Sequence, residues 1–242
     1  PIILSGTRML TFKPGIQPDS SIRAFIEAGA IRLAKPPAEG QIQPASLDLR
    51  LGARAYRVRA SFLPGPERTV RSRIDDLSLH EIDLTQGAVL ETDCVYIAEL
   101  MEGLRLPKGL RAAANPKSST GRLDVFTRVI TDRAREFDLV EDGYDGPLFI
   151  EISPRTFPVL VRSGSRLSQI RFRAGETRLD DRALGEIHVR ETLVSAAEPS
   201  FQGGVAVSVD LSGFDGLLGY RGKHHTALID VDRVGAYRPA DF

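Results

Sequence analysis

The chain has 242 residues, enough for one large domain or two small ones. Basic and acidic residues balance at 32 each, so net charge gives no reason to expect DNA, RNA or a membrane surface as a partner. The single cysteine, Cys94, excludes an intrachain disulfide and fits a reduced, cytoplasmic setting. The apolar start, Pro1 to Leu10, is too short and too broken for a signal peptide or a membrane span.

A short helix is predicted from Asp19 to Gly29. Either of its first two residues can cap its start. Ile22, Phe25 and Ile26 fall on one face, because residues three and four apart are neighbours on a helix. Gly29 suits the left-handed exit that often ends a helix.

From there to about Phe172 the pattern predicts mostly short strands. Polar and apolar residues alternate in some segments, while continuous apolar runs elsewhere fit buried strands. The predicted strands cover residues 46–51, 56–59, 81–84, 95–98, 148–150, 159–161 and 167–172. Many short strands between Gly and Pro turns indicate a mainly β fold: a sandwich, a jelly roll or a distorted barrel.

The last third of the chain is expected to be organised differently. Leu179 to Glu191 can form a further helix, and Pro199 to Gly204 resembles a linker. Beyond that linker, residues 206–211 repeat part of the pattern of residues 44–49. We therefore expect one domain over 15–198 and the start of a second, incomplete copy of the fold at 203–242.

The run from Asn115 to Arg122 has the composition of a phosphate-binding loop. Serine hydroxyls and exposed backbone N–H groups at a turn or helix start bind phosphate oxygens. Lys117 adds a point charge, and Arg122 can make a two-pronged contact. On pattern alone, a solvated Ser/Thr-rich loop is an equally good interpretation.

Two further segments carry acids. In residues 140–146, the glycines three apart predict a tight turn that could approach a sugar, although a simple hairpin turn is the better interpretation from this segment alone. Glu151, between Ile150 and Ile152, is either half-exposed on an alternating strand or points inward. An inward carboxyl group is disfavoured in its charged form, which suits it to proton transfer.

Asp48 is expected to anchor a turn by accepting backbone hydrogen bonds. The histidines do not suggest a metal site: His224 and His225 are adjacent and diverge, while His80 and His188 have no ligand-like partners. The single cysteine and the missing H-x-E…C-x-x-C pattern argue against zinc.

The stretch from about Gly15 to Phe172 resembles the deoxycytidine triphosphate deaminase family, within the trimeric deoxyuridine triphosphatase superfamily. Four segments carry the resemblance, in matching order and spacing: Gly15–Arg23, Gln43–Gly52, Lys117–Leu123 and Gly143–Glu151. The resemblance covers about two-thirds of the chain. It implies a distorted jelly-roll β fold, a homotrimer with active sites between subunits, and zinc-independent hydrolysis of dCTP to dUTP and ammonia.

The resemblance also implies residue roles. Glu151 is similar to the general base of the family, and Ser118 and Arg122 to the residues that hold the water and the developing charge. The triphosphate grip, working with Mg²⁺ bound through the phosphates, would comprise Lys117, Ser118, Ser119, Thr120, Gly121 and Arg122. Glu141 would face the deoxyribose, with Thr131, Phe149 and Ile150 beside the base.

Departures from the family pattern, among them a longer loop from Arg133 to Asp142, leave more than one function open. Lys117 replaces the usual Arg, Thr131-Asp132 replaces Ala-His, and the C-terminal nucleotide-closing arm is not recognisable. A dUTP diphosphatase of the same superfamily would use an acid at Glu141 to activate water, with Tyr144 packed on the nucleoside. The sequence is also compatible with a bifunctional enzyme and with a catalytically inactive nucleotide-binding protein.

Overall fold

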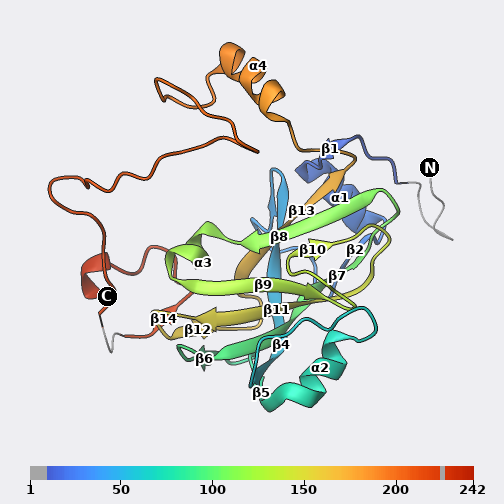
Figure 1. Ribbon diagram of the computed structural model, residues 1–242. Coiled ribbons are helices and arrows are strands. Elements are labelled where there is room, and N and C mark those ends of the chain that lie inside the picture. The colour runs from blue at the N-terminus through green and yellow to red at the C-terminus, as the bar shows by residue number, and fades with distance from the viewer. Residues whose placement is uncertain (1–9, 224–226) are drawn as a thin grey trace. The chain divides into compact units, whose positions relative to one another are not determined.

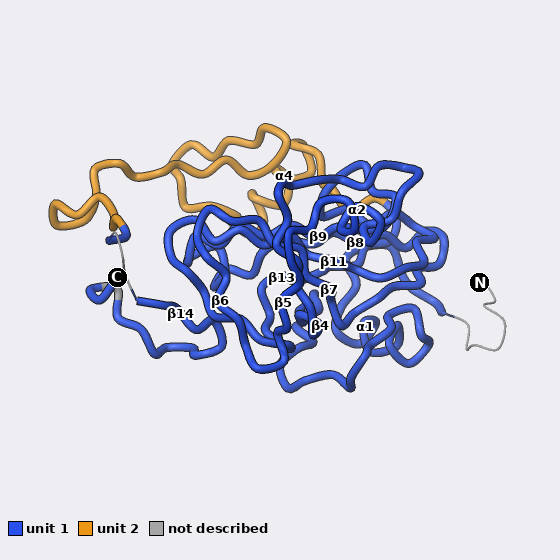
Figure 2. Tube along the Cα trace, turned by 90° about the horizontal axis from the view of Figure 1, so that it is seen from below, with its two compact units in different colours: residues 1–175, 222–242 blue, residues 176–221 orange. Residues whose placement is uncertain are grey.

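The computed structural model describes residues 10–223 and 227–242. The chain divides into two compact units, Pro1–Gly175 with Gly222–Phe242 as unit 1 and Glu176–Arg221 as unit 2 (Figure 2). The strands of unit 1 are β1 (Gly15–Ile16), β2 (Ile31–Leu33), β3 (Ile42–Gln43), β4 (Ser46–Val58), β5 (Ser78–Asp83), β6 (Ala88–Leu90), β7 (Val95–Arg105), β8 (Leu110–Pro116), β9 (Val125–Thr131), β10 (Leu139–Val140), β11 (Asp145–Pro154), β12 (Val159–Val161), β13 (Arg166–Ala174) and β14 (Ile229–Asp230). Its helices are α1 (Asp19–Glu27), α2 (Val70–Leu77), α3 (Ser118–Arg122) and the 3-10 turn η1 (Pro239–Asp241).

One large antiparallel sheet dominates unit 1 and confirms the mainly β, barrel-like prediction (Figure 1). Its strands follow the order β10-β8-β13-β4-β7-β11-β9, and the short strands β1, β2, β3 and β5 add to this path. β4 pairs with β13 near its start and with β7 and β5 toward its end, so this one long strand takes part in both halves of the sheet. A sheet that continues through a shared strand in this way can curve toward closure.

Asp138 brings the two edges of the sheet together. Its backbone N–H donates to the Val129 carbonyl of β9 at 2.8 Å, and its carboxylate accepts from the Val129 N–H at 2.7 Å. Its own carbonyl accepts from the Ala114 N–H of β8 at 2.8 Å. Asp138 has a φ of 64°, a left-handed conformation that Asp tolerates better than most residues. The barrel is therefore nearly closed by one residue that bonds to both edges.

The side chains of β11 alternate between two apolar clusters. Leu148, Ile150 and Ile152 belong to the main core, inside the barrel. Phe149 belongs to a second cluster with Ile74 of α2. This alternation follows from the period of two along a strand, and it puts Glu151 on the same face as Phe149.

The helices differ from the predictions in detail. α1 forms at the predicted position, with Ile22 and Phe25 fully buried, but its N-cap is Pro18 and no side chain caps it. α2 was missed, because its sequence is mostly polar and only Val70 and Ile74 are buried. Its signals were the cap at Thr69, whose hydroxyl accepts from the Ser72 N–H at 3.1 Å, and apolar residues four apart.

Residues 227–242 return to unit 1. β14 pairs in parallel with β12, which also pairs with β6 in a separate three-stranded sheet. Arg162 donates to both carboxylate oxygens of Asp230, at 2.7 and 2.9 Å. The ring of Phe242 packs edge-on against Phe157 and Tyr237.

Unit 2 contains the helix α4 (Asp181–Glu191), which confirms the helix predicted at 179–191. The Asp180 carboxylate caps its start by accepting from the Ala183 N–H at 2.7 Å. Residues 206–211 form no regular secondary structure, unlike the buried strand at 46–51 whose pattern they repeat. The expected boundary between a first domain and a second repeat remains a prediction.

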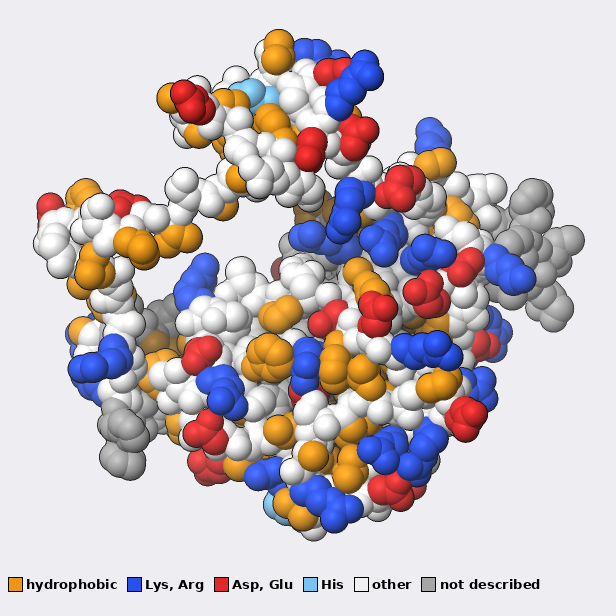
Figure 3. Space-filling view, viewed as in Figure 1, with side chains coloured by type: hydrophobic (Ala, Val, Ile, Leu, Met, Phe, Trp, Pro, Cys, Tyr) orange, Lys and Arg blue, Asp and Glu red, His pale blue; other side chains and the backbone are white. Residues whose placement is uncertain are grey.

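Figure 3 shows basic and acidic side chains interspersed over the visible face of unit 1, in keeping with the balanced composition. Within residues 10–223 and 227–242, no helix has the length and apolar character needed to cross a bilayer.

Candidate active site

The predicted phosphate motif sits at the junction of β8 and β9. Lys117 is the extended N-cap residue of α3, and Ser118, Ser119 and Arg122 on that helix are exposed. Thr120 is buried, and its hydroxyl donates to the Leu167 carbonyl of β13 at 2.7 Å. This hydrogen bond attaches the phosphate motif to the sheet, so the Thr120 hydroxyl proton is already donated within the protein.

Lys117 is held by Asp48, which is only 1% exposed on β4. Arg166 adds a second cation, with its Nη1 3.6 Å from the Asp48 carboxylate. The prediction that Asp48 anchors a turn through backbone hydrogen bonds was wrong: this strand position faces cations, and no described residue forms a hydrogen bond with its Oδ1 atom. Asp48 therefore couples the phosphate motif to the long central strand.

Glu151 is 1% exposed on the face of β11 opposite the main core, so the half-exposed interpretation does not apply. On the neighbouring strand β9, the residue directly opposite Glu151 is Arg128. The Nε and Nη2 atoms of Arg128 donate to Oε1 of Glu151 at 3.1 and 2.6 Å. The second carboxylate oxygen, Oε2, is buried without a hydrogen-bond partner in the described part of the chain.

Glu151 lies on the wall of a cavity of about 340 Å³. The cavity is lined by Ser61, Val95, Phe126, Arg128, Glu151, Ser153 and Arg155. The Ser153 hydroxyl, two positions along the same strand face, is also buried and has no hydrogen-bond partner among the described residues. A buried polar atom without a hydrogen-bond partner destabilises the fold unless a water or ligand bonds to it. This cavity is therefore suited to bind a polar ligand.

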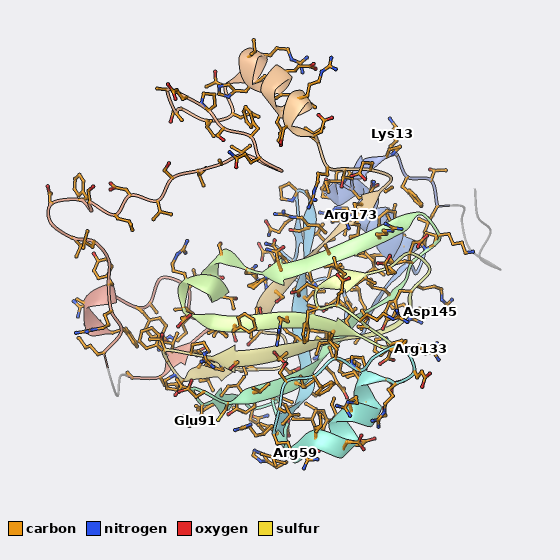
Figure 4. All side chains as sticks on the ribbon, in the orientation of Figure 1. Lys13, Arg59, Glu91, Arg133, Asp145 and Arg173 are labelled. Atoms are coloured by element: carbon orange, nitrogen blue, oxygen red, sulfur yellow. The ribbon has the colours of Figure 1, made fainter. Side chains whose placement is uncertain are left out.

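A second cavity, of about 270 Å³, lies beside the turn that precedes β11. Its walls include Thr131, Glu141 and Tyr144, three residues of the segments predicted to surround the nucleoside. Arg133 on its wall and Asp145, which follows Tyr144, are labelled in Figure 4 at the same end of unit 1. Thr131 is 6% exposed, whereas the Glu141 side chain is largely exposed and pairs with Arg111 at 3.5 Å.

The glycine turn around residues 141–146 is not a hairpin turn. β10 pairs with β8, whereas β11 pairs with β7 and β9, so the turn connects strands that are not neighbours. The Tyr144 hydroxyl donates to the Pro147 carbonyl at 2.6 Å and accepts from the Asp132 N–H at 3.2 Å. Burial raises the pKa of Tyr144 to about 12, so the phenol stays protonated and can keep donating. A Cβ atom at Gly146 would lie 2.5 Å from the Tyr144 hydroxyl, so a larger residue there would displace this hydrogen-bonded ring.

The structure places the predicted residues in separate groups. Phe149 is buried in the second apolar cluster, on the face of Glu151. Ile150 is fully buried in the main core on the opposite face, and β11 is paired with both β7 and β9 at this position. No hydrogen bond or ion pair among the described residues joins the exposed side chains of α3 to Glu151. Sequence reasoning missed Arg128, although a charged residue within the apolar run 125–131 was a signal.

The described ranges hold no group of three or more His, Cys, Asp or Glu residues arranged to bind a metal ion. His188 instead accepts from the Leu193 N–H at 3.0 Å within unit 2. His224 and His225 lie outside the described residues.

Sequence comparison matches residues 13–176 to the 2'-deoxycytidine 5'-triphosphate deaminase (DCD) N-terminal domain and residues 180–242 to the C-terminal domain of the same description. The chain belongs to the dCTP deaminase family. A crystal structure described as 2'-deoxycytidine 5'-triphosphate deaminase from Agrobacterium tumefaciens is 56% identical, with a TM-score of 0.89 over 95% of this chain and 69% of that chain.

More distant members of the dCTP deaminase family match part of the chain. A "dCTP deaminase, dUMP-forming" from Parafrankia is 31% identical over 63% of this chain and 72% of its own length. A "dCTP deaminase" from Natronomonas pharaonis is 30% identical over 64% of this chain and 77% of its own length. The two names differ in whether a dUMP product is specified.

Proposed function

We propose that this chain deaminates dCTP hydrolytically, with Glu151 as the general base. The observation that carries the assignment is a carboxylate 1% exposed on a cavity wall, with one oxygen held by Arg128 and the other without a hydrogen-bond partner among the described residues. The unpaired oxygen is the group that can accept a proton from a water in the cavity. Family membership supports the substrate class.

The reaction balances with this chain's own base. Glu151 takes a proton from water as the oxygen adds to C4 of the cytosine, and the proton passes to N3. The carboxylate then moves the proton of the new C4 hydroxyl to the amino group, which leaves as ammonia while C4 becomes a carbonyl. One carboxylate thus serves as base and then as acid, with dCTP and water giving dUTP and ammonia and no zinc in the scheme.

The α3 motif supplies the phosphate grip. Its exposed hydroxyls and Arg122 are available, and Lys117 is oriented by Asp48. Because the described contacts do not join α3 to Glu151 within one chain, we propose that each site takes α3 from one subunit and Glu151 from another in a homotrimer. In such an assembly Ser118 and Arg122 of α3 would hold the attacking water and the developing charge beside Glu151.

Mg²⁺ is proposed to enter bound to the triphosphate. α3 and its surroundings offer cations and hydroxyls, and the nearby Asp48 carboxylate is already paired with Lys117. These groups fit phosphate oxygens better than a divalent cation, whose ligands would come from the phosphates and water. The ion would neutralise part of the charge of the triphosphate.

The assignment is tested by incubating the protein with dCTP and Mg²⁺ and measuring ammonia. Glu151→Gln removes the base and should lower kcat by about 10²–10⁴-fold. Glu81→Gln is the matched control, since Glu81 belongs to an exposed cross-strand pair with Arg54 and should leave kcat unchanged. An unaffected Glu151→Gln variant would refute the base, and an inactive wild type would refute the activity.

The product needs its own measurement, because some relatives are named dUMP-forming. A dUMP product requires the release of diphosphate as well as ammonia. A diphosphate assay with dCTP and with dUTP therefore distinguishes a deaminase, a bifunctional enzyme and a dUTP diphosphatase. Tight dCTP binding without either product would indicate a nucleotide-binding protein.

A further inference from the structure

Arg128 and Glu151 form a pair that treats the two carboxylate oxygens differently. Both donated hydrogen bonds, from Nε at 3.1 Å and Nη2 at 2.6 Å, end on Oε1. Oε2 is buried and receives none from any described residue. Oε1 is therefore occupied by the ion pair with Arg128, whereas Oε2 has no described hydrogen bond and remains for the reaction.

Arg128 is itself held from three sides. Its Nη2 donates to the Ser61 hydroxyl at 2.8 Å, and its guanidinium lies 3.7 Å from the centre of the Phe137 ring and 4.9 Å from that of Phe126. Arginine stacks on aromatic faces in this way because its cation is planar and weakly hydrated. Contacts from β9 and from two loops thus keep the guanidinium in place before any ligand binds.

We propose that Arg128 is a positioning residue for the deamination: it locks the Glu151 carboxylate so that Oε2 alone faces the reacting water. This inference deepens the proposed function and rests on it. A carboxylate already held in its reactive orientation does not have to be oriented during the reaction, so that entropic cost is not added to the activation barrier.

Two further charged groups lie near the same pair. Asp138, which precedes β10, interacts electrostatically with both Arg128 and Glu151. Arg155, just after β11, lines the cavity but pairs with Asp93 at 3.5 Å. Of these neighbours, only Arg128 donates a hydrogen bond to the Glu151 carboxylate in the described contacts.

The test compares steady-state dCTP deamination by the wild type, Arg128→Gln, Arg128→Lys and Arg54→Gln. Arg54→Gln is the matched control, because Arg54 forms an exposed cross-strand pair with Glu81. Loss of a group that orients an active-site residue costs about 10–100-fold, so we expect kcat of Arg128→Gln to fall by that amount with a KM change below about threefold. Arg128→Lys keeps the charge but loses the two-donor contact with Oε1, so it should recover only part of the lost kcat.

Ser61→Ala is a second probe in case Arg128→Gln does not fold. It removes one hydrogen bond to the guanidinium but no charge, so kcat should fall by less than in Arg128→Gln. Wild-type kcat in both Arg128→Gln and Ser61→Ala would overturn the positioning role. If the wild type releases no ammonia, the proposed function fails and this inference fails with it.

Discussion

Glu102 shows how a single buried charge is accommodated in this protein. Its Oε1 accepts from Arg50 Nε and Gln41 Nε2, each at 2.8 Å, and its Oε2 accepts from the Arg50 backbone N–H at 2.7 Å. Arg50 in turn donates to the carbonyls of Lys35 and Pro36. Burial still raises the pKa of Glu102, so desolvation outweighs these bonds.

Removing the Glu102 carboxylate should therefore destabilise the fold strongly. Glu102→Ala leaves the Arg50 guanidinium buried beside a void, and breaking a buried pair in this way costs about 3–5 kcal/mol. The free energy of unfolding from urea denaturation is the measurement, with Glu81→Ala as the exposed control. A loss below about 1 kcal/mol, as for a surface pair, would contradict this account.

At the scale of elements, the junction of β9 with β10 and β8 depends on Asp138. Burial raises the pKa of this carboxyl, while the hydrogen bond from Val129 opposes the shift. The folded protein therefore binds a proton at Asp138 more tightly than the unfolded chain does. The resulting stabilisation is complete below the unfolded pKa and is lost as the pH rises through the folded value.

Asp138→Asn isolates this effect, because its amide oxygen can still accept from the Val129 N–H. Relative to the wild type, the variant should gain stability as the pH rises from below about 4 toward 7. Free energies of unfolding measured across that range provide the test. A difference that does not change with pH, or that moves in the opposite direction, would show that the buried charge is not the cause.

The helices and strands show how much of the structure could be predicted from the sequence. Strands such as 95–98 and 167–172 were recognisable because hydrophobic periodicity is local. α2 was missed because only two of its residues are buried, so its amphipathic pattern is weak. Asp48 was misread because its partners, Lys117 and Arg166, are distant in sequence, and no local pattern records such a contact. Glu151 was identified from its motif, whereas the role of Arg128 required knowing the register of β9 against β11.

For the whole molecule, the lack of any hydrogen bond or ion pair between α3 and Glu151 in the described contacts gives a test of assembly. Ser118→Ala and Glu151→Gln should each be nearly inactive alone. If sites form between subunits, refolding an equal mixture should restore about a quarter of the wild-type sites, because each subunit can supply the group that the other lacks. Ammonia release from the mixture is the measurement. A mixture as inactive as its components would place both groups of each site in one chain.

Unit 1 is built from two stretches of chain joined through residues 176–221. The second stretch is attached by β14, by the Arg162–Asp230 fork and by the packing of Phe242. A protease that cuts once among the exposed residues 205–212 would therefore nick the polypeptide without dissociating it. The two fragments should co-elute on a native sizing column and separate only in denaturant. Residues 222–242 would then remain bound to unit 1 as a peptide, without needing the covalent link through residues 176–221.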